Sequence, residues 1–123
     1  MQTEQIFILG KNQAALQTRE LDIANLGAHD LLIETECSFI SAGTELSIFT
    51  GEDKGTITEG SWCSWPFAAG YSNVGRVLQR GSRVSRFETG DRVFSFGLHA
   101  SHHIWDSDNP MRLSAAVPEN VMQ

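Results

Sequence analysis

The chain has 123 residues, a normal length for one domain, and 41% of them are hydrophobic, which is enough apolar material to build a core. Nothing in this composition is typical of disorder. The formal net charge is −6, and the arginines between Arg76 and Arg86 would be divided between the two faces of a strand. Both features argue against nucleic acid as the main partner.

The cysteines and the apolar segments point to the cellular environment. The two cysteines, Cys37 and Cys63, are too few for a disulfide framework, and free thiols suit a reducing cytoplasm. No stretch approaches the roughly 20 apolar residues that a membrane span needs, and the N-terminal residues lack a basic targeting region. We therefore expect a cytoplasmic protein without a membrane partner.

The first predicted elements are strands. Short apolar stretches predict strands at residues 5–9 and 14–21, with a hairpin turn at residues 10–12. Residues 30–40 form a longer predicted strand, because their side chains alternate in polarity. One face of this strand should carry Leu31, Ile33, Thr35 and Cys37, and the other Leu32, Glu34 and Glu36.

The middle of the chain changes in character. Residues 41–51 suit one or two helical turns, with Thr44 as the N-cap and Gly51 at the end. Residues 52–66 form a long polar connection of a kind that is often functional. Strands resume at residues 73–78, 92–96, 99–105 and 113–117, with turns around Gly81 and Gly90.

Many short strands and little helix predict an all-β barrel or sandwich. No βαβ alternation and no Gly-x-Gly-x-x-Gly turn occurs in the sequence. Residues 70–75 carry two glycines but lack the Lys-Ser/Thr of a phosphate-binding loop. We therefore expect a single domain over residues 1–123 that contains no Rossmann domain and binds no dinucleotide alone.

Three segments occur in a fixed order: Ile-Ser-Ala-Gly-Thr-Glu at residues 40–45, Gly-Tyr-Ser-Asn-Val-Gly-Arg-Val at 70–77 and Thr-Gly-Asp-Arg-Val at 89–93. With residues 117–121, they resemble the N-terminal, GroES-like, substrate-side domain of the medium-chain dehydrogenases/reductases. Alcohol dehydrogenases of that superfamily carry Cys-Gly-Thr-Asp, then Gly-His-Glu, then Gly-Asp-Arg-Val. The resemblance runs from about residue 16 to residue 121 and implies a partly open β-barrel with one or two short helical turns.

The departures from the family pattern concern zinc. In zinc-dependent members, the Cys of the first segment and the His of the second bind the catalytic metal, whereas here these positions are Ala42 and Tyr71. A methyl group cannot bind zinc, and a phenol is a poor ligand near neutral pH. The four closely spaced cysteines of the structural zinc lobe are also missing from the sequence. The resemblance therefore points to a zinc-less branch, such as the quinone oxidoreductases, with neither catalytic nor structural zinc.

The resemblance also suggests roles for residues at the predicted helix start. Thr44 matches the hydroxyl that takes the substrate proton, although the residues alone equally suit a helix N-cap. Glu45 matches an acid that holds the ligand His. With that His absent, we expect a solvated carboxylate or a hydrogen bond to Tyr71. The position of the family's relay His is Ser47, and with Glu45 it is expected near the substrate.

Aromatic residues supply the remaining pocket candidates. Tyr71 stands where a metal would polarise the carbonyl, and its phenol could donate to a developing oxyanion, or it could be a half-buried wall residue. Ser72 takes the position of the family's Glu beside it. Trp62 and Trp65 would either form an apolar lid over the substrate or close one end of the barrel.

Three histidines lie close together near the end of the chain. On a strand, His99 and His103 would share a face and His102 would point away. Two ligands do not make a tight metal site, so we expect solvated or hydrogen-bonded histidines.

The sequence thus predicts the substrate-side catalytic domain of an NAD(P)-dependent oxidoreductase, inactive alone, with a small carbonyl, alcohol or enone as substrate. NAD(P) would be held by a Rossmann domain following Gln123, and the parent protein is expected to be a homo-oligomer. The alternative is a stand-alone GroES-like binding module that uses residues 51–60 as a partner loop, although this loop offers only one strong hydrophobe, Ile57.

Overall fold

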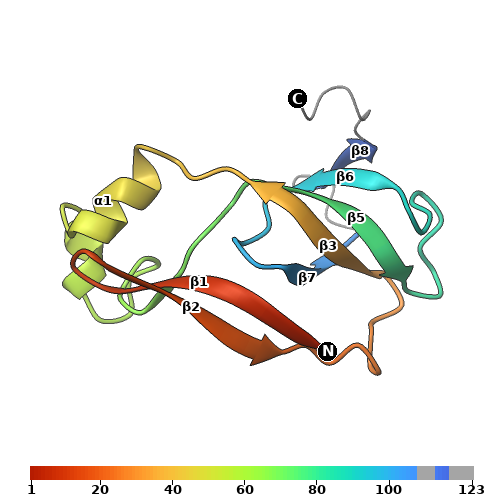
Figure 1. Ribbon diagram of the computed structural model, residues 1–123, viewed down its shortest axis with the longest axis horizontal. Helices are drawn as coiled ribbons and strands as arrows, with labels where there is room; N and C mark the ends of the chain where they lie inside the picture. Colours follow the sequence, from red (N-terminus) through yellow and green to blue (C-terminus); the bar gives the residue numbers. More distant parts are fainter. Residues whose placement is uncertain (108–112, 117–123) are drawn as a thin grey trace.

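The computed structural model describes residues 1–107 and 113–116, and two antiparallel sheets with little helix make up the fold. This confirms the predicted all-β class. Figure 1 shows the helical segments at one end of the molecule and most of the larger sheet at the other. The elements are β1 (Gln2–Gly10), β2 (Gln13–Glu20), β3 (Asp30–Ser38), α1 (Thr44–Thr50), the 3-10 helix η1 (Lys54–Ile57), β4 (Phe67–Ala68), β5 (Asn73–Arg80), β6 (Arg92–Ser95), β7 (His102–Asp106) and β8 (Leu113–Ala116).

The smaller sheet has the strand order β2-β1-β4. Its β1–β2 hairpin has the turn predicted at residues 10–12, where Asn12 takes a left-handed conformation with φ 57°. Asparagine tolerates this conformation better than most residues because its short side chain can hydrogen-bond locally. Both strands extend beyond the apolar stretches that predicted them.

The larger sheet has the strand order β7-β3-β5-β6-β8. Leu31, Leu32 and Ile33 are all buried at the start of β3, and Leu31 and Ile33 share a core cluster that does not include Leu32, in agreement with the predicted alternation. The pairing of β3 with β5 shifts between Leu32 and Ile33, where the extra residue lies in β5, and again between Thr35 and Cys37, where it is Glu36 of β3. An extra residue changes the face to which the following side chains of its own strand point, so the alternation of β3 is interrupted at Glu36.

The two sheets join through β1 and residues 99–101. The backbone N–H of Ile6 donates to the His99 carbonyl at 2.9 Å, and the N–H of Ser101 donates to the Glu4 carbonyl at 2.8 Å. The strand predicted at residues 99–105 therefore begins only at His102, because the backbone before it bonds to β1. The result is a partly open barrel (Figure 1).

Two apolar clusters form the core. One lies on the larger sheet and comprises Leu31, Ile33, Val77, Val84, Phe87 and Val93, with Trp105 packed against it. The other lies between α1 and the smaller sheet and comprises Ile8, Ile48, Cys63 and Ala69, with Ile6, Phe49, Trp65 and Phe67 around it. Burial of these side chains is the main stabilising contribution, at roughly 25 cal/mol for each Å² removed from water.

The predicted helix is present, but its N-cap is Gly43, without a side-chain cap, and Thr44 is the first helical residue. Thr44 is therefore not the N-cap, and its backbone N–H donates instead to the Ser41 hydroxyl at 3.3 Å. The predicted end is confirmed, since Gly51 has the left-handed φ of 78° that favours glycine.

The connection after α1 is anchored at two points. The Asp53 carboxylate accepts from the Gly55 N–H at 2.9 Å at the start of η1, and Thr56 is buried. A partner loop of the alternative binding-module hypothesis would need to release these contacts. At the other end of the chain, the expected segment 117–121 lies outside the described residues.

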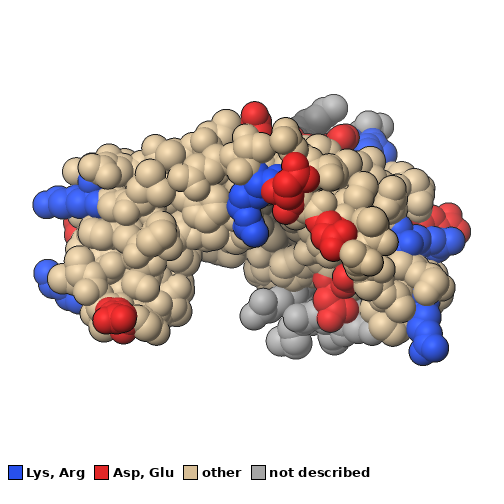
Figure 2. Space-filling view, turned by 90° about the horizontal axis from the view of Figure 1, so that it is seen from below, with Lys and Arg blue, Asp and Glu red and all other residues tan. Residues whose placement is uncertain are grey.

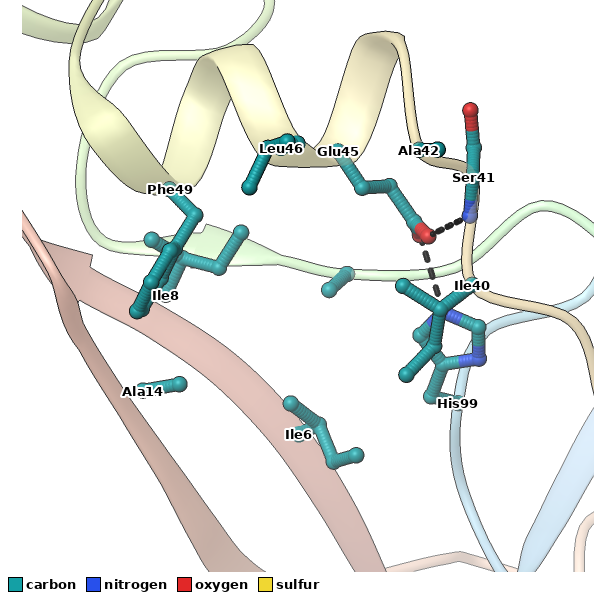
Figure 3. Close-up of a pocket in the computed structure, with 11 residues that line it drawn as sticks. Ile6, Ile8, Ala14, Ile40, Ser41, Ala42, Glu45, Leu46, Phe49 and His99 are labelled. Atoms are coloured by element: carbon teal, nitrogen blue, oxygen red, sulfur yellow. Dashed lines mark hydrogen bonds and ion pairs between the residues drawn. The ribbon is translucent and has the colours of Figure 1, made fainter.

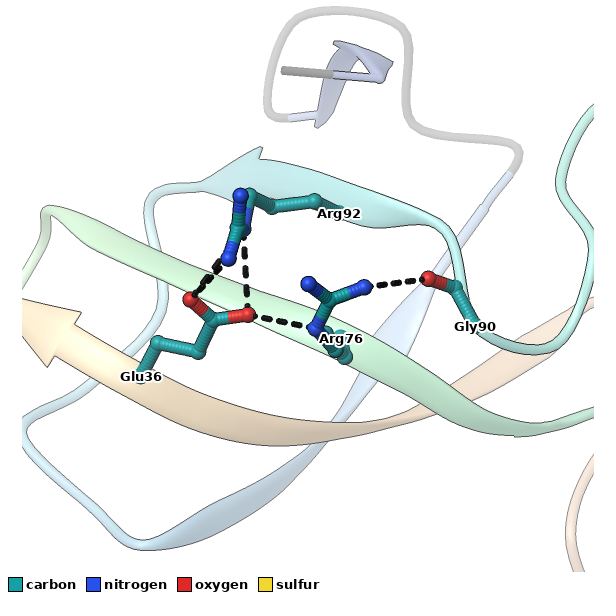
Figure 4. A network of polar contacts seen from close by, with 4 residues as sticks. All are labelled: Glu36, Arg76, Gly90 and Arg92. Carbon is teal, nitrogen blue, oxygen red and sulfur yellow. Dashed lines mark hydrogen bonds and ion pairs between the residues drawn. The ribbon is translucent and has the colours of Figure 1, made fainter. Parts of the chain in front are cut away.

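Charged groups lie in small mixed clusters. Figure 2 shows Lys and Arg next to Asp and Glu over both ends of one face, and the outline is indented between the ends. In one cluster, the Arg92 guanidinium donates to both Glu36 oxygens, and Arg76 Nε lies 2.8 Å from Oε1 (Figure 4). The Arg92 hydrogen bond is the main reason that the pKa of Glu36 lies below its ordinary value.

Within the described residues, no helix is long and apolar enough to cross a membrane.

Candidate functional site

An apolar pocket of about 340 Å³ lies between α1, β1 and the segment that leads into α1 (Figure 3). A volume of this size matches the lower end of small-molecule sites, which are mostly apolar with a few polar groups. This apolar pocket is lined by Ile6, Ile8, Ala14, Ile40, Ser41, Ala42, Glu45, Leu46, Phe49, Ala69 and His99.

Glu45 is the charged residue of the lining, and only 4% of it is exposed. Its Oε2 accepts from the Ser41 backbone N–H at 2.7 Å, and its Oε1 lies 2.9 Å from His99 Nε2. Figure 3 shows the carboxylate pointing from α1 toward the imidazole. The expectation of a solvated carboxylate or a bond to Tyr71 is therefore wrong, because the carboxylate is buried and meets the buried ring of His99.

Hydrogen bonds fix both the ring and the backbone of His99. Its Nδ1 lies 2.7 Å from Ser38 Oγ, and its backbone N–H donates to the Ala69 carbonyl at 2.9 Å. Gly70 permits this approach, since it has φ +116°, and a Cβ there would lie 2.2 Å from the His99 backbone nitrogen. The glycine of the second motif thus makes room for the His99 backbone.

A second cavity of about 310 Å³ lies on the other side of His99 and is more polar. We call it the polar groove. It is lined by Glu4, Ile6, Leu16, Thr35, Glu36, Cys37, Ser38, His99, Ala100 and Ser101. Ile6 and His99 therefore belong to the walls of both cavities.

Tyr71 and Ser72 lie at one end of the larger sheet, outside the linings of both cavities. The backbone N–H of Phe39 donates to the Ser72 carbonyl at 3.0 Å. Tyr71 is 42% exposed. Its two predicted roles, as a donor to an oxyanion or as a wall residue, both stay predictions.

Thr44 and Ser47 lie on α1, close in sequence to the pocket residues but outside its lining. Thr44 is exposed. The Ser47 hydroxyl donates to the Thr44 carbonyl at 3.2 Å within the helix. Ser47 therefore serves the helix backbone in this structure.

The two predicted lid tryptophans take different positions. Trp65 packs against the cluster around Ile48 and donates its indole N–H to the Ile48 carbonyl at 3.1 Å. Trp65 thus helps to close the α1 end of the barrel. Trp62 is 69% exposed and meets the Phe67 ring edge-on, with 5.9 Å between ring centroids. Neither tryptophan lines the apolar pocket.

His103 is buried in the larger sheet, where Nε2 lies 3.2 Å from Ser95 Oγ and Nδ1 has no hydrogen-bond partner among the described residues. Burial, assisted by the nearby His102, lowers the pKa of His103 from 6.5 to about 4. His99 and His103 do not share a strand face, because His99 precedes β7. Among the described residues, no three His, Cys, Asp or Glu side chains gather to hold a metal.

The sequence reasoning missed Ser38 and the pairing of His99 with Glu45. His99 and Glu45 are 54 positions apart in the sequence. A histidine in a predicted strand carries no local signal of its partner, since the pairing depends on how β1 and residues 99–101 meet. Only the cluster of three histidines could have directed attention to this segment.

No protein-family model matches the chain, and no curated protein matches it. Solved structures with the same fold include a mutant form of enoyl thioester reductase from Candida tropicalis, with a TM-score of 0.69 and 20% identity over 96% of this chain and 34% of that one. The CurF cyclopropanase of the curacin A biosynthetic pathway has a TM-score of 0.72 and 20% identity over 92% and 35%. Quinone oxidoreductase from Coxiella burnetii has a TM-score of 0.67 and 15% identity over 94% and 37%.

These solved structures share the fold of this chain. The chain spans about a third of their length. At these identities the likeness concerns the fold, and function has to be argued from the residues of this chain.

Proposed function

We propose that this chain is the substrate-side domain of an NAD(P)-dependent, zinc-free oxidoreductase of the medium-chain superfamily. The observation that carries the proposal is the apolar pocket with one buried, hydrogen-bonded carboxylate, Glu45, in a fold shared with such enzymes. The pocket suits a substrate with an apolar body and one oxygen atom. A small carbonyl compound, alcohol or enone has this character.

An exposed apolar surface supports a second domain. Ser38, Asn73 and Ser95 lie side by side at one end of the larger sheet, because Asn73 pairs with both of the others. The residues next to this end leave large apolar side chains exposed, and monomeric proteins rarely leave such side chains grouped together. They are Phe39, Ile40, Tyr71 and Phe96. We propose that a nucleotide-binding domain covers this surface.

The described residues offer no cradle for a dinucleotide. Gly75 lies within β5, where a Cβ would come 2.3 Å from the Glu34 carbonyl oxygen, so this glycine serves strand packing and not a phosphate turn. The proposed second domain would hold the cofactor by a helix N-terminus after a strand. When bound, the nicotinamide ring supplies or accepts the hydride. A solved structure of the same fold, 19% identical, is described as a complex with NADP and crotonyl-CoA.

The residues do not fit catalytic zinc. Ala42 lies in the pocket lining at one of the family's ligand positions and carries no donor atom. Tyr71 stands at the other. We propose that Glu45 meets the substrate oxygen inside the pocket, while the hydroxyls of Tyr71 and Thr44 hydrogen-bond to the part of the substrate that extends from the pocket toward the second domain. Both residues are exposed, so a substrate between the two domains could reach them.

The test uses the product of the complete native gene. It should oxidise NADPH or NADH in the presence of small ketones, aldehydes or enones, while the 123-residue chain alone should be inactive. Glu45→Gln should lower turnover about 100-fold, within the range of general acid–base catalysis, and Ile57→Ala, a change of an exposed residue on η1, should not. The proposal fails if the complete protein transfers no hydride, or if the native reading frame ends at Gln123.

A further inference from the structure

The ring of His99 lies between two cavities of different character, the apolar pocket and the polar groove. On one side, Nε2 meets Glu45, which lines the apolar pocket. On the other, Nδ1 meets Ser38, which lines the polar groove. The imidazole is buried, with only 5% of the residue exposed, whereas Ser38 is exposed. One ring therefore connects an apolar pocket with a polar groove.

The hydrogen bonds of this chain of groups have a direction. Glu45 as a carboxylate accepts from the Ser41 N–H at one oxygen, so its other oxygen accepts the Nε2 proton of His99. In the neutral ring Nδ1 is then an acceptor, and the Ser38 hydroxyl donates to it. Two lone pairs of Glu45 remain, one on each oxygen, and they can meet a polar group in the apolar pocket.

Neutral imidazole can pass a proton without turning. When Nδ1 gains the Ser38 proton and Nε2 gives its proton to Glu45, the ring changes tautomer and stays neutral. Ser38 then takes a proton from water in the groove. The net result is one proton moved from groove water to the carboxyl group on the apolar side of the ring.

We propose that Ser38, His99 and Glu45 form the proton relay of this protein, with Glu45 as the group that exchanges a proton with the substrate. The inference rests on the proposed function and narrows its substrate to an apolar molecule whose hydroxyl or carbonyl oxygen reaches Glu45. The resemblance places a relay histidine at the position of Ser47. In the proposed relay, His99 from a distant segment takes that role.

In the direction of reduction, one hydride and one proton are transferred to the substrate. The substrate carbonyl carbon gains a hydride with its electron pair from reduced nicotinamide, and the C–O π pair moves onto oxygen. That oxygen takes the proton of the Glu45 carboxyl group and becomes a hydroxyl. The proton now on the product is the one that Nε2 delivered, so His99 is left with its single proton at Nδ1 and Ser38 has been reprotonated by groove water. Before the next turnover, Nδ1 releases its proton to the groove through Ser38, and Nε2 takes a proton from water that enters the pocket after the product has left. Alcohol oxidation reverses each move.

Proton exchange tests the relay without cofactor or substrate. In the 123-residue chain labelled with ¹⁵N-histidine, NMR measures how fast the His99 ring proton exchanges with water. The relay predicts that Ser38→Ala slows this exchange at least tenfold, because the path to the groove is cut. The exposed Ser82→Ala variant should exchange like the wild type. If the Glu45–His99 pair is only structural, Ser38→Ala will leave exchange unchanged or accelerate it, and the relay is overturned.

Turnover of the complete protein supplies the second readout. His99→Gln keeps an amide that can bond to Glu45 and Ser38 but cannot change tautomer. It should lower kcat about 100-fold, the range of general acid–base catalysis, with KM little changed. An unchanged kcat in both His99→Gln and Ser38→Ala overturns the relay. A wild-type protein without hydride transfer, but with slowed exchange in Ser38→Ala, overturns the proposed function and supports the proton path.

Discussion

The burial of the His103 imidazole predicts how the free energy of unfolding depends on pH. This prediction does not depend on the function of the protein. Its pKa is about 4 in the folded protein and 6.5 without the fold, because burial disfavours the charged form. Between these two values the unfolded chain binds more protons than the folded one. Stability should therefore be complete above pH 6.5 and should fall as the pH drops toward 4.

The size of the effect follows from the same two values. Each pKa unit corresponds to about 1.4 kcal/mol, so the shift is worth about 3 kcal/mol in full and about 2 kcal/mol between pH 7 and pH 4.5. Urea unfolding at both pH values measures it. We expect the wild-type chain to lose about 2 kcal/mol more than His103→Gln, which cannot titrate.

Ser95→Ala is the matched control for this experiment. It removes the hydroxyl 3.2 Å from His103 Nε2 but leaves a buried imidazole that still titrates. The Ser95→Ala variant should be less stable at both pH values and should keep the pH slope. If His103→Gln loses as much stability as the wild type between pH 7 and 4.5, the reasoning from burial is wrong.

Three further predictions concern the backbone near the site, the surface charges and metal content. Gly70→Ala should cost about 1–3 kcal/mol or more and shift the His99 ring signals in NMR spectra, whereas Gly60→Ala, which has a similar positive φ of +80° but no close neighbour, should cost less and leave those signals in place. Glu36→Gln should lower the free energy of unfolding by about 1 kcal/mol or less in low salt, because Glu36 forms ion pairs with Arg76 and Arg92. High salt should shrink this difference from the wild type by screening the charges. The untagged chain should purify without bound zinc, and elemental analysis showing one tightly held zinc per chain would contradict the zinc-free assignment.

Much of the fold could be read from local patterns. The hairpin around residues 10–12, the end of α1 at Gly51 and the turn at Gly90 all depend on backbone conformations that few residue types accept. Polarity patterns located most of the strands for a related reason, since the burial of successive side chains in a strand is a local property. Errors arose where a distant segment intervened, as at residues 99–101, which bond to β1 and precede the start of β7.

The candidate site divides in the same way. The sequence by itself determined that Ala42 brings no metal donor, that an acid follows Thr44, and that the chain is rich in strands. Only the tertiary structure decided what that acid contacts. Glu45 meets His99 because residues 99–101 bond to β1 and Gly70 leaves room for their backbone. Contacts between segments so far apart depend on how the sheets close, and no periodic pattern within either segment records that.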